Sequence, residues 1–248
     1  MRKPTRAHLK MTSKGKINNC RDCPSRGTTE WQVLGDCELE SINDAKRTLT
    51  YEPGETLYAQ GDPGNGVYCI KSGLIGLRRV DVNGNSVLLR LSAAGSTVGY
   101  RTFLSRQAHT NSAEVLTTSV VCYIARPQIE KLLKANPLLG ERFLQHFSED
   151  ASEMEDDYVR SMTMAMKSRF LHLILVFYER FGYEDKDGKA TVELPVKRSE
   201  LAELVGVRPE SISRLIDKLE SENVMRFNDR RVQISDISEI LEQVGPAV

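Results

Sequence analysis

The sequence predicts an α+β fold in which a β-roll is followed by a long helix and then by a winged helix-turn-helix. Between residues 47 and 127, short apolar runs alternate with glycines at intervals of roughly ten residues, which is typical of an antiparallel roll or barrel. After residue 136, apolar residues recur at steps of three and four, which indicates helices. A turn glycine at 206 and a helix-starting proline at 209 then separate two short helices.

The composition excludes some classes of protein. A chain of 248 residues can hold one large domain or two of ordinary size. The formal net charge is zero, so the chain is not uniformly basic, but residues 1–26 hold eight Lys or Arg against one Asp and predict a mobile basic arm. No apolar segment of a signal peptide follows this arm, and no run approaches the ~18 apolar residues of a membrane span. We therefore expect a cytoplasmic protein.

Short β-like runs predict the strands of the roll. They are residues 56–58, 67–70, 75–80, 87–91 and 120–124. The pair Asn83-Gly84 lies between the third and fourth runs and has the composition of a hairpin turn.

A long helix is predicted to open at Asn136-Pro137. It carries a coiled-coil-like seam at Phe147, Ala151, Met154, Tyr158, Ser161 and Ala165. Residues 148–157 include six acids and no base, and most of these acids fall off the seam, as a contact between two copies requires. We therefore predict dimerisation along this helix; packing of the helix on its own domain is the alternative. A second helix is predicted at 167–181, and a charged loop at 182–189.

Residues 199–219 have the layout of a helix-turn-helix. Ser199 is predicted to cap the first helix, and Gly206 to end it, because glycine adopts the left-handed conformation of a sharp turn. Pro209 suits the first turn of the second helix, where its missing N–H costs nothing. The apolar residues of the first helix are Leu201, Ala202, Leu204 and Val205. The buried stripe of the second helix is predicted to be Ile212, Leu215, Ile216 and Leu219.

The opposite face of the second helix predicts DNA binding. Its polar residues are Glu210, Ser211, Ser213, Arg214 and Asp217. In a major groove, arginine can bind guanine O6 and N7, and glutamate can accept from cytosine N4. Residues 223–234 alternate around Asn228-Asp229, which indicates a hairpin, or wing, after the reading helix. The basic residues expected near DNA phosphates are Arg208, Arg226, Arg230 and Arg231.

The order of roll, long helix and winged helix-turn-helix covers nearly the whole chain. Three short motifs accompany it: Glu210-x-x-Ser213-Arg214, Val121-Cys122 and Cys20-x-x-Cys23. Together these features resemble the catabolite-activator/FNR (Crp/Fnr) superfamily of bacterial transcription regulators, and its FNR-like branch in particular. The resemblance implies a homodimer that binds double-stranded promoter DNA at an inverted repeat and acts with RNA polymerase. It also implies a protein that is not an enzyme, in keeping with four scattered histidines that have no metal-ligand spacing.

The resemblance divides the chain into four parts. Residues 1–34 are the expected basic N-terminal arm with a cysteine pair, and residues 35–135 the sensory, cyclic-nucleotide-binding-like β-roll. Residues 136–166 are the expected dimerisation helix, and residues 167–248 the winged helix-turn-helix domain.

The family's cyclic-nucleotide contacts are missing from this sequence. Cyclic-nucleotide binders of the superfamily have a Gly-Glu pair and an Arg-Ser/Thr-Ala, whereas here Gly99 precedes Tyr100 and the second motif is Asn111-Ser-Ala. Asparagine has no charge to offset a phosphate. We therefore expect cyclic AMP not to bind. Arg101 and His109 are nearby, and binding of another anion by them is the alternative.

The cysteines raise the question of a redox sensor. FNR-type oxygen sensors hold a [4Fe–4S] cluster with a Cys-x2-Cys-x5-Cys run and a fourth cysteine in the roll. Cys20, Cys23 and Cys122 fit this pattern, but the third position of the run is Thr29. Cys37 is expected to replace it, which makes Cys20, Cys23, Cys37 and Cys122 the predicted cluster ligands. Cys69 lies between strand residues and is expected in the core.

The cysteines leave alternatives open. A Cys-x-x-Cys pair also suits a thiol–disulfide switch or half a zinc site, and the cysteines can lack a cofactor altogether. The alternative function is therefore an effector-binding or thiol-redox sensor without an iron–sulfur cluster.

Overall fold

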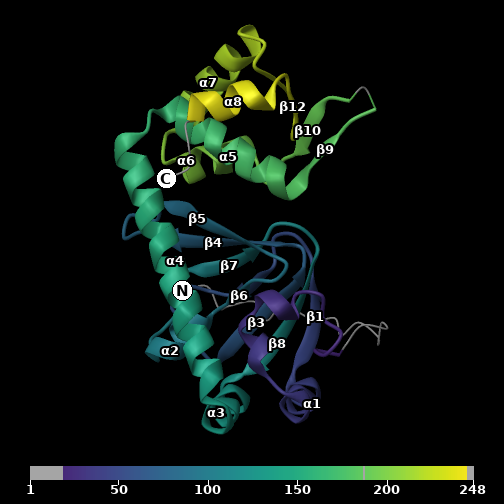
Figure 1. The fold of residues 1–248 in the computed structure, drawn as a ribbon. Helices are drawn as coiled ribbons and strands as arrows, with labels where there is room; N and C mark the ends of the chain where they lie inside the picture. Colours follow the sequence, from purple (N-terminus) through teal and green to yellow (C-terminus); the bar gives the residue numbers. More distant parts are fainter. Residues whose placement is uncertain (1–18, 187, 245–248) are drawn as a thin grey trace. The chain divides into compact units, whose positions relative to one another are not determined.

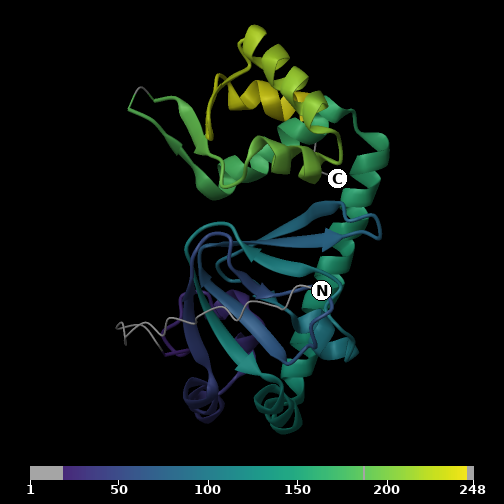
Figure 2. The same cartoon turned by 180° about the vertical axis from the view of Figure 1, so that it is seen from behind.

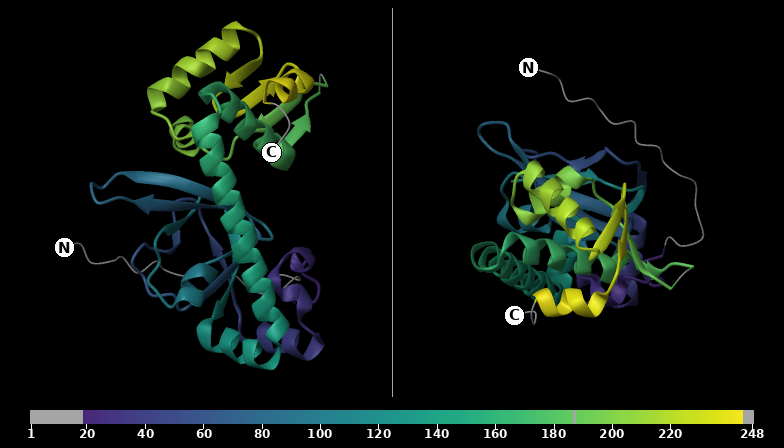
Figure 3. Two further views of the ribbon diagram at one scale, coloured as in Figure 1. Left: turned by 60° about the vertical axis from the view of Figure 1, so that its left-hand side comes forward. Right: turned by 90° about the horizontal axis from the view of Figure 1, so that it is seen from above.

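The chain forms two compact units. The structure, a computed structural model, describes residues 19–186 and 188–244, so most of the expected basic arm lies outside it (Figure 1). One unit ends at Asp150 and the other begins at Ala151. Helix α4 (Pro137–Thr163) contributes residues to both and is a single unbroken helix (Figure 3). Among the described residues, no helix is long and apolar enough to cross a membrane.

The first unit is built on two antiparallel sheets of four strands each, which face one another (Figures 1 and 2). One sheet has the order β1 (Arg47–Tyr51), β8 (Ser119–Ala125), β3 (Gly66–Ser72) and β6 (Thr97–Val98). The other has the order β2 (Thr56–Tyr58), β7 (Ser112–Val115), β4 (Leu74–Val80) and β5 (Ser86–Ala93). Val121, Ile75 and Val115 are fully buried between the sheets. All five predicted strands are confirmed. The sequence pattern did not predict the other three strands, β1, β6 and β7.

The predicted turn at Asn83-Gly84 is confirmed. It lies in the loop 81–85 that joins β4 to β5, where Gly84 adopts a φ of +86°. The Asp81 carboxylate accepts hydrogen bonds from the backbone N–H groups of Asn83 and Asn85. Such a side-chain-to-backbone turn is a usual role for aspartate.

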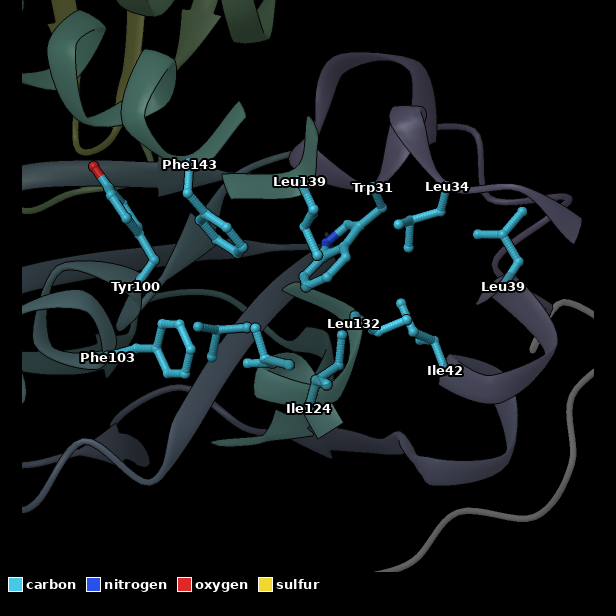
Figure 4. Packing of buried hydrophobic residues seen from close by; sticks show 12 residues of the cluster. Trp31, Leu34, Leu39, Ile42, Tyr100, Phe103, Ile124, Leu132, Leu139 and Phe143 are labelled. Carbon is cyan, nitrogen blue, oxygen red and sulfur yellow. The ribbon is translucent and has the colours of Figure 1, made fainter. Parts of the chain in front are cut away.

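The outer face of the β1-β8-β3-β6 sheet is covered by helical segments. They are η2 (Glu30–Val33), which follows the short η1 (Arg26–Thr28), and α1 (Asp36–Ala45), α3 (Arg126–Ala135) and the first half of α4. Trp31 of η2 packs edge-on against Phe143 of α4, with 5.8 Å between ring centroids, and Leu139 lies beside them (Figure 4). Side chains of α2 (Tyr100–Ser105) complete the cluster. The predicted roll omitted α1, because only Leu39 and Ile42 of that mostly polar helix are buried.

The second unit confirms the predicted helices and corrects two details. Its elements are α5 (Met166–Phe181), β9 (Gly182–Glu184), β10 (Ala190–Glu193), α6 (Arg198–Val205), α7 (Pro209–Ser221), β11 (Met225–Asn228), β12 (Arg231–Ile234) and α8 (Ile237–Val244). The strands form one sheet in the order β11-β12-β10-β9, so the expected loop at 182–189 begins with a strand. The N-cap of α6 is Lys197 instead of Ser199, because the Glu200 carboxylate accepts a 2.7 Å hydrogen bond from the Lys197 backbone N–H.

Candidate DNA interface and cysteine cavity

The turn between α6 and α7 positions α7 so that one of its faces packs into the core and the other does not. Gly206 ends α6 in the left-handed conformation, with a φ of +74°, and the Val207 N–H donates to the Ala202 carbonyl oxygen at 3.0 Å. Pro209 then starts α7 as expected. The predicted stripe is confirmed as fully or nearly fully buried: Ile212, Leu215, Ile216 and Leu219.

Because that stripe is buried, the opposite face of α7 is open. Glu210, Ser213, Arg214 and Asp217 are exposed, and Ser211 is half-buried. Glu210 and Arg214 lie four residues apart, so their side chains project from the same face one turn apart. The Ser213 hydroxyl donates to the Pro209 carbonyl oxygen at 3.2 Å.

The wing follows α7 as a hairpin of β11 and β12. Asn228 pairs with Arg231, which leaves Asp229 and Arg230 as a two-residue turn. Asp229 has a φ of +53°, which aspartate tolerates better than most residues. The Glu220 carboxylate of α7 accepts from the Phe227 N–H at 2.8 Å and so ties the wing to the helix.

The arginines expected near DNA phosphates, one at the start of α7 and three on the wing, have different surroundings. Arg208, Arg226 and Arg230 are exposed. Arg231 is also exposed, but its guanidinium lies 3.4 Å from the Asp185 carboxylate, so part of its charge is already offset.

In the first unit, four cysteines line one small cavity of about 50 Å³. They are Cys20, Cys23, Cys69 and Cys122. Cys20 and Cys23 lie on the loop before η1, where the Cys20 N–H donates to the Asn43 side chain of α1 at 2.8 Å. Cys69 on β3 is the direct antiparallel partner of Cys122 on β8. Two of the thiols are therefore positioned by a sheet and two by a loop.

Hydrogen-bond donors surround these sulfurs. The Lys46 ammonium lies 3.1 Å from Cys20 Sγ, and the Trp31 indole N–H donates to Cys69 Sγ at 3.0 Å. The Thr48 hydroxyl lies 3.6 Å from Cys122 Sγ. Donors of this kind stabilise negative charge on sulfur and adjust the properties of a sulfur-bound metal group.

Burial acts against ionisation of two of the thiols. Burial raises the pKa of the Cys20 thiol, and the nearby Lys46 ammonium opposes part of that rise. Burial, with the Glu30 carboxylate next in importance, raises the pKa of the Cys69 thiol well above its ordinary value. Both thiols therefore favour their protonated forms unless a positive ion binds them.

Cys37 does not join this cavity, contrary to the predicted ligand set. It is the second residue of α1 and is exposed, whereas Leu39 and Ile42 of the same helix face the core. Cys69, expected in the core, does pack against the buried cluster, yet it also lines the cavity. Thr29 lines it as well, with its hydroxyl donating to the Arg26 carbonyl oxygen.

The cavity is lined by the kind of side chains that ligate an iron–sulfur cluster, but these side chains are not arranged as a metal site in this structure. Within residues 19–186 and 188–244, no three His, Cys, Asp or Glu side chains are arranged to hold a metal ion. The number and type of side chains nevertheless match the four thiolates that [4Fe–4S] clusters use.

A chain of polar contacts leads from this cavity to α4. Thr97, beside Cys69, donates to the Glu30 carboxylate at 2.8 Å. Glu30, which is only 2% exposed, also hydrogen-bonds the imidazole of His146 on α4. His146 Nε2 lies 3.7 Å from the Asp150 carboxylate. Asp150 in turn accepts from the Tyr100 hydroxyl and pairs with Arg90 at 2.6 Å.

Buried aromatic rings lie beside Asn111, the residue at which the resemblance expects the arginine of a cyclic-nucleotide site. His109 is 4% exposed and stacks on Tyr58, with ring centroids 3.7 Å apart. The Tyr58 hydroxyl is 3.4 Å from the Asn111 side-chain oxygen, and His109 Nδ1 is 3.1 Å from the Thr102 hydroxyl. Burial lowers the pKa of His109, so this ring favours its neutral form.

Comparisons with known proteins agree with this architecture. Residues 48–136 match the cyclic nucleotide-binding domain family, and residues 168–242 match the Crp-like helix-turn-helix domain family. The chain belongs to the Crp/Fnr superfamily of transcription regulators, which bind DNA through the helix-turn-helix and are not enzymes.

Similar proteins include regulators of the FNR-like branch. The transcriptional activator protein FnrL of Cereibacter sphaeroides is 22% identical over 233 residues, which cover 92% of this chain and 93% of that protein. The anaerobic regulatory protein of Pasteurella multocida is 23% identical over 245 residues, covering 97% and 88%. A CRP/FNR-family regulator from Thermus thermophilus has the same fold, with a TM-score of 0.69, 24% identity, and coverage of 82% of this chain and 100% of that chain.

The contact between Glu30 and His146 generates a prediction. The hydrogen bond to the Glu30 carboxylate raises the pKa of His146 above its ordinary value near 6.5; burial opposes this rise, and the charges of Glu30 and Asp150 add to it. Replacing Glu30 with Gln removes one of these charges, so the pKa of His146 should fall. An NMR titration of the histidine side chains measures it, with the His146→Asn variant to assign the signal. Glu40→Gln, at an exposed position of α1, is the control and should leave the pKa unchanged.

The same pKa implies a pH dependence of stability. The folded pKa is raised, so the charged histidine stabilises the fold fully below 6.5, and this contribution is lost as pH rises through the folded value. A His146 pKa that is the same in the Glu30→Gln variant as in the wild type would contradict the pairing.

Proposed function

We propose that this chain is a homodimeric regulator that reads an inverted repeat in promoter DNA and responds to a redox or oxygen signal instead of cyclic AMP. The observation that carries the DNA-reading role is the exposed polar face of α7, which holds Glu210, Ser213 and Arg214 opposite a buried stripe. A homodimer suits this role, because two reading helices one DNA turn apart match an inverted repeat. In such a complex RNA polymerase is the expected partner at the promoter.

We assign the residues of α7 to roles in a half-site related to TTGAT, by family resemblance and side-chain chemistry. Arg214 binds a guanine, Glu210 accepts from the complementary cytosine edge, and Ser213 meets a base edge or methyl group. Ser211 lies beside them. Arg208, Arg230 and Arg231 contact phosphates, which position the protein but do not specify the sequence.

Replacing Arg214 with Ala should weaken binding to the inverted repeat by about 1–3 kcal/mol and barely change binding to random DNA. The reason is that a base contact exists only at the specific sequence. Fluorescence-anisotropy titrations with both DNA duplexes measure the effect. Arg230→Ala is the matched control: as a phosphate contact, it should weaken both complexes alike and reduce the salt dependence. If Arg214→Ala loses the same binding free energy on both duplexes, Arg214 contacts a phosphate and not a base.

Dimerisation is proposed along residues 137–165. Helix α4 ends at Thr163, so the predicted seam residue Ala165 lies beyond the helix and only the seam residues up to Ser161 lie on it. Phe147, Met154 and Tyr158 belong to the seam and are 42%, 49% and 64% exposed, which is unusual for large apolar side chains on one helix. A second copy of the same helix, packed about a twofold axis, would cover them, because such an interface uses the same surface on both chains.

Replacing Met154 or Tyr158 with Asp should yield a monomer with much weaker DNA binding. Each new carboxylate would face its own copy or a close neighbour across the twofold axis, in an apolar seam. Sedimentation velocity measures the oligomeric state. Ser152→Asp, at an exposed position off the seam, is the control and should remain dimeric. A stable dimer in both seam variants would rule out this interface.

The signal is proposed to enter at the cysteine cavity through a [4Fe–4S] cluster, which supplies sensitivity to oxygen when bound. This is supported by the four clustered thiols with their donors, and by the resemblance to FNR-type regulators. A thiol-redox sensor without a cluster is the alternative, because paired cysteines also suit a disulfide switch. In either case, the contacts from Thr97 through Glu30 to His146 offer a physical connection to α4.

Cyclic AMP is proposed not to act as the effector. Asn111 offers no charge to a cyclic phosphate, and the stacked rings of Tyr58 and His109 occupy the interior of the roll. Calorimetric titration with millimolar cyclic AMP should give no saturable heat. A dissociation constant in the micromolar range would overturn this part of the proposal.

A further inference from the structure

We propose that Cys69 is the fourth thiolate ligand of the cluster, together with Cys20, Cys23 and Cys122, and that Cys37 is not a ligand. The inference rests on the proposed function, since it specifies which side chains hold the cluster. Its basis is the convergence of these four thiols on one cavity, from which Cys37 is absent.

The sheet fixes the position of Cys69 relative to Cys122. The two residues oppose each other directly in the antiparallel pairing of β3 with β8. Residues paired in this way project from the same face of a sheet, with Cβ atoms roughly 4.5–5.5 Å apart. That face is the outer one, toward the loop that carries Cys20 and Cys23. The sheet therefore supplies two adjacent thiols on a rigid support, and the loop supplies two on a support that can adapt.

The surroundings of Cys69 also differ from those of a cysteine that merely fills space. Its sulfur accepts a hydrogen bond from the Trp31 indole at 3.0 Å, and the Thr97 hydroxyl lies at 3.9 Å. Cys20 has a comparable donor in Lys46, and the Thr48 hydroxyl hydrogen-bonds the sulfur of Cys122. Two of the four sulfurs, those of Cys20 and Cys69, thus accept from a close N–H donor, and such contacts stabilise metal-bound thiolates.

Moving Cys37 into the cavity would require unwinding the start of α1. The Glu38 carboxylate, one residue on, accepts from the Gly35 backbone N–H at 2.8 Å and from the Asn136 side chain at 3.1 Å. These contacts fix the first turn of the helix with Cys37 exposed. The thiol of Cys69 needs no comparable rearrangement.

Binding of iron by these residues is an exchange of protons for metal. Each thiol loses its proton to solvent as its sulfur binds iron, and the oxidation state of the cysteine does not change. The cavity of about 50 Å³ has room for only a few water molecules, so the Cys20–Cys23 loop must move outward to admit a cluster.

The test is anaerobic reconstitution of the full chain with iron, sulfide and a thiol reductant. Iron and sulfide per chain, together with the absorbance at ~400 nm typical of an iron–sulfur cluster, are measured for the wild type, Cys69→Ser, Cys69→Ala and Cys37→Ser. Cys37→Ser is the matched control and should load as fully as the wild type. Both Cys69 variants should lose most of the iron and sulfide. Because Trp31 is the only tryptophan and touches Cys69, its fluorescence reports whether each variant is folded around the cavity.

The possible outcomes separate the ligand set from the cluster itself. Full loading of both Cys69 variants would overturn the inference, as would loss of iron in Cys37→Ser, because either result contradicts the assigned ligands. If the wild type takes up neither iron nor sulfide, the proposal of a cluster is wrong, and so is the assignment of Cys69 as one of its ligands. DNA reading by α7 would be unaffected by that result.

Discussion

The first unit depends on one buried contact, the hydrogen-bonded pair of Glu30 and His146. Glu30 is almost fully buried, and an unpaired carboxylate in such a place costs several kcal/mol. The cost is offset because Glu30 accepts from Thr97 on β6 and pairs with His146 on α4. Three segments that are distant in the sequence are therefore held together at one point. Removing His146 would take one of two hydrogen-bond partners from the almost fully buried Glu30 carboxylate, and a buried carboxylate that loses a partner is costly, which is why this contact constrains the arrangement.

The residue next to Glu30 connects the same point to the cysteines. Trp31 donates to the sulfur of Cys69 and packs on Phe143 of α4. A change at the cysteine cavity, whether loss of a cluster or oxidation of a thiol, would thus act on two adjacent residues that both touch the long helix. Packed contacts of this kind tend to switch between discrete arrangements instead of deforming gradually. The proposed route from the signal to α4 needs only these neighbouring contacts.

The sequence predicted what is local and missed what is long-range. The turn at Gly206 and the start of α7 at Pro209 follow from backbone preferences of single residues, so the helix-turn-helix and its buried stripe were readable. The N-cap of α6 was misplaced because the Glu200 side chain, instead of the Ser199 hydroxyl, accepts from a backbone N–H at the start of the helix.

The candidate cluster ligands could not be predicted from local sequence in the same way. Cys69 meets Cys122 through the pairing of β3 with β8, which no spacing along the chain reveals. Cys37 is closer in sequence to the cysteine pair, but α1 turns it toward solvent.

The central claim is that the state of the cysteine cavity sets the affinity for DNA. The most direct measurement is an anisotropy titration of inverted-repeat DNA with the reconstituted full chain, carried out without oxygen and repeated after exposure to air. The account predicts tighter binding without oxygen, because an intact cavity would hold the N-terminal loop against the contacts that support α4 and the dimer seam proposed on it. Equal affinity under both conditions, with the protein folded and dimeric, would contradict it.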